Sequence, residues 1–265
     1  MRKRRFGPAE VPIIGQGTWK LYGKEAVDAL RMGIDLGLTH IDTAEMYGTE
    51  EIVGEAIEGR RDEVFLVSKV LPSNATRRGT LRACEQSLKR LRTDRLDCYL
   101  LHWPGEHPLE ETIAAFEELQ AKGKIRSYGV GNFDEKLLER AASIAGPGRI
   151  ACDQVLYSLP ERHSEARVLP ECRRLGAVMV GYSPFQGLPD RGELLAVALE
   201  LRATIRQVAL AFLTRLPDTF AIPKASRVAH VRENAGAATL TLTAEQIARL
   251  DRAYPIRIRP ELPVI

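Results

Sequence analysis

The chain has 265 residues, 45% hydrophobic and 28% charged, a balance that excludes a disordered or collagen-like protein. Its formal net charge of +3 is slight, so we expect neither a nucleic-acid partner nor a membrane partner. The one basic cluster is the opening MRKRR, which we expect to be solvated. No apolar segment follows it and no apolar run nears membrane-spanning length, so we expect no secretory signal and no membrane span.

The predicted elements begin with residues 4–17, which contain Gly-Pro and predict a hairpin covering the lower mouth of a barrel. Beyond it, short apolar runs alternate with amphipathic stretches. The runs predict eight strands, at residues 13–19, 38–44, 64–70, 96–103, 126–133, 151–158, 177–184 and 220–226. Apolar spacing of three and four predicts helices at residues 24–37, 80–92, 109–123 and 205–216.

Most of these runs are apolar without alternation, which is typical of strands buried on both faces of a parallel sheet. Eight strand–helix units in this length predict an α/β fold, the (β/α)8 barrel. No linker divides the chain, so we expect one domain over residues 1–265. Residues 243–254 predict an extra C-terminal helix capped by Thr243, and the tail 255–265 holds three prolines that cannot continue it.

The four cysteines give no sign of a metal site or a disulfide framework. None belongs to a CxxC pair or lies among histidines at zinc-binding spacing. Cys98 and Cys152 lie inside apolar strand-like runs, where a free thiol behaves as a small hydrophobic group. We therefore expect no bound metal and a reduced, cytoplasmic protein.

Two GxG fragments, at residues 15–19 and 129–133, do not indicate a Rossmann domain. Both lack the third glycine, and neither opens a helix in the Rossmann manner. In a barrel, we expect such glycines to let a ligand approach the strand ends closely.

Polar residues follow the predicted strands at the ends where barrel enzymes form their active sites. In chain order these residues are Asp42, Tyr47, Lys69, His102, Asn132, Gln154, Tyr182 and Lys224. Each has an ordinary alternative, because a lone Asp is often a turn residue, a lone Lys is usually solvated and a lone His is often structural. Asp42, Lys69 and His102, however, end three successive strands and should converge on one mouth.

This set suits proton delivery to a carbonyl oxygen. A tyrosine has a pKa near 10, which a neighbouring ammonium lowers and burial raises. An Asp paired with the same Lys keeps the ammonium charged, and His102 can donate a hydrogen bond that orients a substrate oxygen. These groups supply no electrons, so a reduction would need a hydride cofactor.

The last strand indicates an anion site. Lys224, Ser226 and Arg227 lie just ahead of a predicted helix, where cationic and hydroxyl groups join free helix N–H donors. Barrels commonly bind phosphate near strands 7 and 8. The alternative is an ordinary capped helix with solvated basic residues. At the end of the preceding strand, GYSPFQG (181–187) adds the aromatic face of Tyr182 and a turn able to pass a pyrophosphate.

The ordered motifs GTW, DTAEMYG, VSKV, LLHWP, GVGNF, DQVLYS, YSPFQG and IPKASRVAHVREN resemble the aldo-keto reductase family over nearly the whole chain. The resemblance is to its bacterial-type, short-loop members. It implies a (β/α)8 barrel that binds NADPH in extended form and reduces aldehydes and ketones, or oxidises the matching alcohols. We expect a monomer whose partner is a small carbonyl substrate.

The resemblance also implies residue roles. Tyr47 is the implied general acid, Lys69 with Asp42 lowers its pKa, and His102 orients the carbonyl. Trp19 and Trp103, with Tyr47 and His102, line the implied substrate pocket. The implied cofactor residues are Thr18, Trp19, Asn132, Gln154, Tyr182, Ser183, Pro184, Phe185, Gln186, Gly187, Lys224, Ala225, Ser226, Arg227, His230, Glu233 and Asn234.

Two departures from the family pattern modify these expectations. Gly131 stands where relatives carry a serine, so we expect weaker nicotinamide anchoring, with Asn132 and Gln154 compensating. His230 stands where many relatives carry an arginine, and a neutral His is a poorer phosphate partner. We therefore expect NADPH to be preferred and NADH to be tolerated. The short loop of about ten residues after the seventh strand, 184–193, suggests an open, permissive site.

Other functions remain alternatives on the sequence alone. A Schiff-base aldolase would use Lys69 as its nucleophile, although the Asp42 and Tyr47 context argues against it. A metal-dependent hydrolase would need a denser ligand set than five histidines without HxH on the first strand. A cofactor-sensing subunit could bind NADPH on the same scaffold without efficient turnover.

Overall fold

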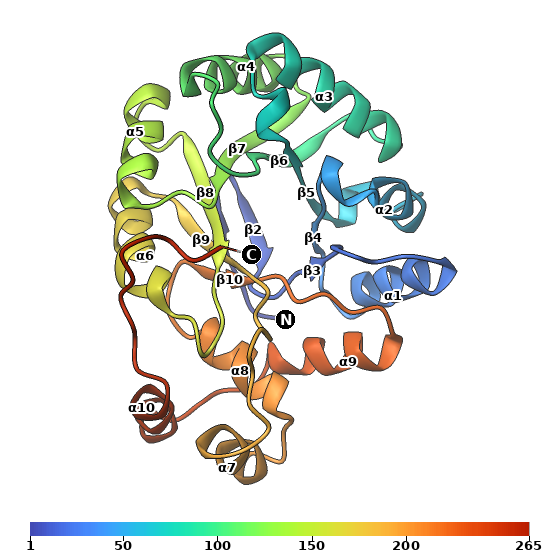
Figure 1. The fold of residues 1–265 in the computed structure, drawn as a ribbon. Helices are drawn as coiled ribbons and strands as arrows, with labels where there is room; N and C mark the ends of the chain where they lie inside the picture. Colours follow the sequence, from blue (N-terminus) through green and yellow to red (C-terminus); the bar gives the residue numbers. More distant parts are fainter. Residues whose placement is uncertain (265) are drawn as a thin grey trace.

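The computed structural model describes residues 1–264, in which eight parallel strands form a barrel enclosed by helices (Figure 1). The sheet order is β10-β9-β8-β7-β6-β5-β4-β3. Bridges from Ile14 to Ala221 and from Gly17 to Lys224 join the two end strands and close the barrel. The predicted fold class is confirmed. The strands are β3 (Gln16–Gly17), β4 (His40–Asp42), β5 (Phe65–Val70), β6 (Leu96–Leu101), β7 (Ile125–Gly131), β8 (Ile150–Leu156), β9 (Val178–Tyr182) and β10 (Thr219–Ala221).

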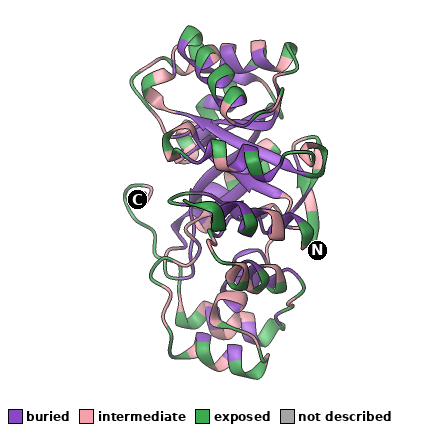
Figure 2. Cartoon of the chain, turned by 90° about the vertical axis from the view of Figure 1, so that its right-hand side faces the viewer, coloured by how far each residue is buried: buried purple, intermediate pink, exposed green. Residues whose placement is uncertain are grey.

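The strands form the most buried part of the molecule, as Figure 2 shows by their purple colour. Every residue of β5, β6 and β8 is buried, because one face of each strand points into the barrel and the other meets the helices. This two-sided burial explains why the sequence shows apolar runs without alternation.

The helices predicted from apolar spacing are confirmed, and their observed ends lie within three residues of the predicted ones. Thr243 forms a capping box with Gln246 at the start of the extra C-terminal helix, as predicted. The helices are α1 (Lys24–Asp35), α2 (Glu50–Ala56), α3 (Arg77–Arg90), α4 (Leu109–Ala121), α5 (Glu135–Ala145), α6 (His163–Leu175), α7 (Glu193–Glu200), α8 (Ile205–Leu213), α9 (Val228–Ala237) and α10 (Ala244–Ala253). Three short 3-10 helices are η1 (Glu45–Tyr47), η2 (Arg61–Glu63) and η3 (Pro72–Asn74).

The N-terminal hairpin covers the lower mouth, as predicted. Strand β1 (Lys3–Phe6) pairs antiparallel with β2 (Ala9–Pro12), and Figure 1 shows β2 behind the barrel opening. The Phe6 ring lies 4.8 Å from the ring of Phe65 and 5.3 Å from that of Phe220. His40 is enclosed by the same rings, and its burial lowers its pKa to about 3. The floor of the barrel is therefore an apolar plug around a neutral histidine.

The opening basic cluster is exposed at Arg2, Lys3 and Arg5, as expected, but Arg4 is half-buried. Arg2 Nε donates to the carbonyl of Ala238 at 2.8 Å. Arg4 Nη1 donates to Leu216 at 2.5 Å, and its Nη2 donates to Thr214 at 2.9 Å. These carbonyls follow α8 and α9, where helix C-termini leave acceptors unpaired. The two arginines thus bind the hairpin to the ends of these helices.

The GxG glycines have a different role from the one expected. A Cβ on Gly17 would lie 2.7 Å from the carbonyl oxygen of Ile222, and one on Gly131 would lie 2.7 Å from that of His102. Both positions therefore need glycine because neighbouring backbone approaches closely. Close packing between strands, rather than room for a ligand, accounts for them.

Two features are absent from residues 1–264. No helix there has the length and apolar character needed to cross a membrane. No group of three or more His, Cys, Asp and Glu side chains there is arranged to hold a metal ion. The four cysteines are all buried and unpaired.

Candidate active site

Four side chains converge where β4, β5 and β6 end, as the strand-end pattern predicts. Lys69 Nζ lies 2.5 Å from Asp42 Oδ1, and both side chains are only 1% exposed. The Tyr47 hydroxyl lies 3.3 Å from Lys69 Nζ and 3.3 Å from His102 Nε2. The neighbouring strands set this geometry, because Asp42 on β4 is paired with Val67, two residues before Lys69 on β5.

Burial governs the protonation of this group. Burial raises the pKa of Tyr47 above its usual value near 10, while the charge of Lys69 lowers it and that of Asp42 raises it. The expectation that Lys69 with Asp42 lowers this pKa is therefore correct only for Lys69, and burial outweighs it. Burial and the charge of Lys69 lower the pKa of His102 to about 3. Both the phenol and the imidazole are neutral at pH 7.

The ammonium of Lys69 remains charged in this environment. Burial alone would lower its pKa, but the nearby Asp42 and Tyr47 raise it above the usual value. Lys69 Nζ also donates to the carbonyl of Thr43 at 2.9 Å. Gln154 Nε2 reaches from β8 to donate to Asp42 Oδ2 at 2.7 Å, so both carboxylate oxygens are occupied. Such a paired and hydrogen-bonded ion pair tolerates burial.

A cluster of buried threonine hydroxyls lies beneath Asp42. Thr18 Oγ1 donates to the Asp42 carbonyl and contacts Thr49 Oγ1, both at 3.0 Å. Thr43 Oγ1 lies 3.1 Å from the same Thr49 oxygen. Thr18 is fully buried, so its hydroxyl supports β4 and faces no solvent-accessible ligand position. A cofactor contact through the Thr18 side chain would have to break these hydrogen bonds.

The residues predicted to hold nicotinamide lie together on β7, β8 and β9. Asn132 has a left-handed backbone (φ 58°), and its Nδ2 donates to the His102 carbonyl at 3.1 Å. The Tyr182 hydroxyl donates to Asn132 Oδ1 at 2.9 Å, and the Asn132 backbone nitrogen donates to the Gln154 carbonyl at 2.9 Å. The predicted pyrophosphate segment turns sharply after Tyr182, with left-handed backbones at Ser183 and Gly187. Their roles toward a cofactor remain predictions.

The predicted anion site surrounds the start of α9. This helix begins at Val228, and Arg227 at its N-cap position makes no side-chain cap hydrogen bond, so the capped-helix alternative is not supported. Lys224 and Arg227 are exposed, and Arg227 Nη2 lies 3.0 Å from His230 Nε2. Burial, Arg227 and Arg206 together lower the pKa of His230. Uncapped helix N–H groups beside these cations can receive a phosphate.

Arg206 belongs to this basic region, although no sequence motif indicates it. It lies on α8, 3.7 Å from Glu233 of α9, and its guanidinium lies 5.4 Å from the ring of Phe185. Only the packing of α8 against α9 brings it there. Asn234, another predicted cofactor residue, is 3% exposed and would offer little surface to a ligand in this arrangement.

The two tryptophans predicted to line a substrate pocket lie against the rings of Tyr47 and His102. The Trp19 ring lies 5.0 Å from that of Tyr47 and is 44% exposed. Trp103 is half-buried, with its ring 4.6 Å from that of His102. They form an apolar wall on either side of the phenol and the imidazole.

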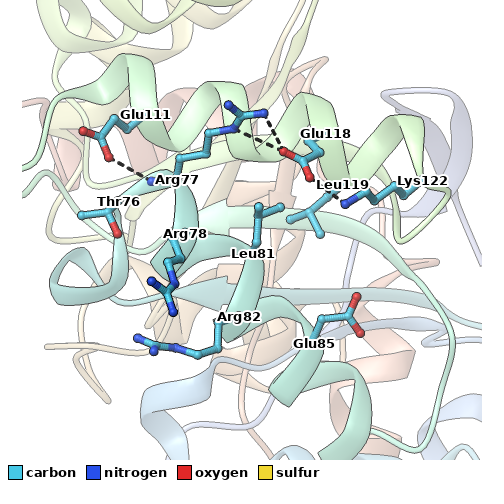
Figure 3. A pocket seen from close by; sticks show the side chains of 10 residues that line it. All are labelled: Thr76, Arg77, Arg78, Leu81, Arg82, Glu85, Glu111, Glu118, Leu119 and Lys122. Carbon is cyan, nitrogen blue, oxygen red and sulfur yellow. Dashed lines mark hydrogen bonds and ion pairs between the residues drawn. The ribbon is translucent and has the colours of Figure 1, made fainter.

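A separate hollow of ≈ 630 Å³ lies outside the barrel between α3 and α4 (Figure 3). Arg77 and Lys122 both pair there with Glu118, at 2.8 and 2.6 Å. None of the strand-end residues lines it, so it is a surface groove apart from the candidate site.

Together, the barrel and this site define an oxidoreductase of the barrel class rather than a Rossmann enzyme. A family model described as the aldo/keto reductase family matches residues 13–193 and 186–255. The chain belongs to this family, and it is an enzyme that acts on aldehydes and ketones. The resemblance to this family that the sequence motifs indicate is confirmed.

Three relatives illustrate the similarity. The methylglyoxal reductase YeaE of Escherichia coli (strain K12) is 44% identical over 265 residues, covering 94% of this chain and 93% of its own. The glyoxal reductase of Bacillus subtilis (strain 168) is 34% identical, covering 91% of this chain and 88% of its own. The crystal structure of an aldo/keto reductase from Klebsiella pneumoniae in complex with NADP and acetate is 44% identical, with a TM-score of 0.94, covering 100% of this chain and 99% of that one.

Proposed function

We propose that the protein reduces small 2-oxoaldehydes, the class that includes methylglyoxal and glyoxal, with NADPH as the hydride donor. The observation that carries this proposal is the neutral phenol of Tyr47, 3.3 Å from both Lys69 and His102 at the barrel mouth. The relatives named methylglyoxal reductase and glyoxal reductase support the substrate class. The relative crystallised with NADP supports the cofactor.

Tyr47 delivers the proton in this reaction. His102, neutral at pH 7, hydrogen-bonds the substrate carbonyl oxygen and holds it near the Tyr47 hydroxyl. As negative charge develops on that oxygen, the hydroxyl donates its proton, and the Lys69 ammonium stabilises the phenolate left behind. Asp42 keeps Lys69 charged. Bound NADPH supplies the hydride to the carbonyl carbon.

The chain offers a matched set of groups for NADPH. Asn132 and Gln154 keep amide donors and acceptors at the mouth beyond those they use internally, and Tyr182 presents a ring beside them. The turn Ser183–Gly187 contacts the basic region, because the Arg206 guanidinium lies 5.4 Å from the Phe185 ring. We assign the 2′-phosphate and adenine end to Lys224, Ala225, Ser226, Arg227, His230, Glu233 and Asn234.

The cofactor preference follows from this basic region. Lys224, Arg206 and Arg227 favour the additional phosphate of NADPH over NADH. His230 is neutral, and its pKa is lowered by burial and by these cations. It adds no charge of its own, so we propose that NADH is used less efficiently but is tolerated.

The site suits small substrates. Trp19 and Trp103 supply the apolar walls, and only residues 183–192 lie between β9 and α7. Such a short loop covers little of the mouth. A large, selective pocket would need more chain there than this segment provides.

Steady-state oxidation of NADPH with a panel of carbonyls tests the proposal. We expect kcat/KM to be highest for methylglyoxal and glyoxal and lower for simple ketones and long-chain aldehydes. The same panel with NADH should give a lower kcat/KM throughout. Turnover of none of these carbonyls would refute the proposal and favour the cofactor-sensing alternative. A preference for bulky ketones would refute the substrate class alone.

The Schiff-base alternative conflicts with the state of Lys69. An amine nucleophile must be neutral, yet Asp42 at 2.5 Å and Tyr47 raise the pKa of this buried ammonium. If Lys69 formed a Schiff base, borohydride would reduce it and attach the carbonyl substrate covalently to the enzyme, and we expect no such labelling. Covalent labelling in this experiment would support the aldolase alternative.

We also propose that the enzyme works as a cytoplasmic monomer of one domain, residues 1–265. Every group of the candidate site comes from a single chain. Four free, buried cysteines suit a reducing compartment. Sedimentation at micromolar concentration would detect a dimer if one forms.

A further inference from the structure

Tyr47 lies on a loop rather than on a barrel strand. The 3-10 helix η1 starts after Ala44, and no side chain of the described residues caps it. Its middle residue, Met46, is 40% exposed. Asp42 and Lys69, in contrast, are fixed by the paired strands β4 and β5. Another interaction must therefore hold the phenol at a working distance from Lys69.

The Glu45 carboxylate fastens this loop to the segment that follows β5. Its Oε1 accepts hydrogen bonds from the Leu71 backbone nitrogen at 2.5 Å and from Asn74 Nδ2 at 3.1 Å. Glu45 precedes Tyr47 by two residues, and Leu71 follows Lys69 by two. Two bridges, Tyr47–Lys69 and Glu45–Leu71, thus join the two segments. Hydrogen bonds to a charged acceptor are stronger than those between neutral groups.

The segment that receives Glu45 is itself fixed to the outer helices. The Asn74 carbonyl accepts from Thr80 Oγ1 at 3.2 Å at the start of α3. Thr112 of α4 donates to the Ala75 carbonyl at 2.7 Å. Glu111 accepts from the Arg77 backbone nitrogen at 3.0 Å, as the dashed line in Figure 3 shows. Glu45 is therefore attached to a rigid support.

We propose that Glu45 is a positioning residue that holds the Tyr47 hydroxyl against Lys69 and His102 and thereby sets the rate of proton transfer. This inference rests on the proposed role of Tyr47 as the acid. Both contacts of the hydroxyl measure 3.3 Å, at the long end of the hydrogen-bond range, so a small displacement breaks them. Apart from Thr18 and Trp19, the proposed cofactor residues lie on or just after β8 to β10, just after β7 and in α9, so we expect NADPH binding not to depend on this bridge.

The test compares Glu45→Ala with Glu45→Gln, using methylglyoxal and NADPH. For Glu45→Ala we expect kcat to fall by about 10- to 100-fold, because misplacement of a reacting group by about 1 Å has such an effect. The Kd of NADPH should stay unchanged, and the solvent isotope effect on kcat should rise as proton transfer becomes limiting. Glu45→Gln retains an acceptor for the Leu71 nitrogen and should keep most of the activity. Glu51→Ala, which removes an exposed carboxylate from nearby α2, is the matched control.

Several results would overturn the inference. One is a wild-type kcat in Glu45→Ala, and another is a fall in kcat that is equally large in Glu45→Gln. A third is a fall in kcat that comes with an unchanged solvent isotope effect and fewer NADPH-binding sites. Adding Asn74→Ala to Glu45→Ala should change kcat little, because both remove the same bridge, and a fully multiplicative loss would also contradict it. If Tyr47→Phe stays active, the proposed function fails. If Tyr47→Phe is inactive and Glu45→Ala is active, only this inference fails.

Discussion

Tyr47 and His102 show how burial decides the chemistry of individual residues in this protein. Lys69 alone would favour the phenolate of Tyr47, yet burial keeps its pKa above the usual value. His102, which the sequence could not place relative to solvent, is buried and has a pKa of about 3. Both side chains are thus neutral at neutral pH, as the proposed mechanism requires of a phenol that donates a proton and an imidazole that orients the carbonyl.

Asp153 on β8 is a second residue whose environment sets its protonation. Its side chain is fully buried, its Oδ2 has no hydrogen-bond partner in the described chain, and burial raises its pKa well above the usual value. The folded protein therefore keeps this carboxyl protonated, whereas the unfolded chain ionises it above a pH of about 3.9. Folding stability is consequently lost as the pH rises above that value.

Asp153→Asn should stabilise the protein, because a neutral amide needs no proton to remain buried. We expect the free energy of unfolding to rise by about 1–3 kcal/mol at neutral pH. The gain should be larger at pH 8 than at pH 5, since only the wild type loses stability over that interval. Urea unfolding at both values measures it. A gain that does not vary with pH, or a loss at both values, would show that Asp153 is not held protonated.

At the scale of elements, local patterns predicted the strands and the long amphipathic helices well. Two-sided burial makes a continuous apolar run, and the capping box at Thr243 is a local signal. Two of the helices outside the four predicted stretches have interrupted or short patterns. Helix α6 contains Pro170, which interrupts the helical pattern, and α2 spans only two turns.

The site was predictable where it depends on strand ends and not where it depends on packing between distant segments. The ends of β4, β5 and β6 necessarily meet, so Asp42, Lys69 and His102 could be grouped from the sequence. The hydrogen bond from Gln154 to Asp42 joins residues 112 positions apart, and Arg206 reaches the basic region from another helix. Neither contact follows from a local pattern, because side-chain reach across the barrel is set only by the complete fold.

Gly131 on β7 carries a prediction about the packing of neighbouring strands. Any side chain there would bring a Cβ within 2.7 Å of the His102 carbonyl and 3.3 Å of the Gln154 carbonyl. We expect Gly131→Ser to lower the free energy of unfolding by about 1–3 kcal/mol, the usual cost of overpacking. NADPH binding should weaken rather than improve, because His102 and Gln154 must shift.

Urea unfolding together with NADPH titration measures both effects of Gly131→Ser. A variant that is as stable as the wild type and binds NADPH more tightly would contradict this account. That outcome would instead support the expectation from the sequence that Gly131 weakens nicotinamide binding because it has no hydroxyl.

At the scale of the whole molecule, the two proposed functions lie on different sides of the barrel. Strands β4 to β6 and the loop of Tyr47 carry the proposed proton-transfer group, and β7 to β10 with α9 carry most of the proposed cofactor site (Figure 1). The N-terminal hairpin closes the opposite end, which leaves one open mouth for the two proposed sites. This arrangement predicts that proton delivery can be removed without loss of cofactor binding.

The central claim is that Tyr47 donates the proton in NADPH-dependent carbonyl reduction. Its most direct test is Tyr47→Phe, which removes one hydroxyl, with NADPH binding followed by fluorescence titration and turnover followed with methylglyoxal. We predict an unchanged NADPH Kd and a fall in kcat of at least about 100-fold, the usual contribution of a general acid. A Tyr47→Phe enzyme that binds NADPH and keeps the wild-type kcat would contradict the claim.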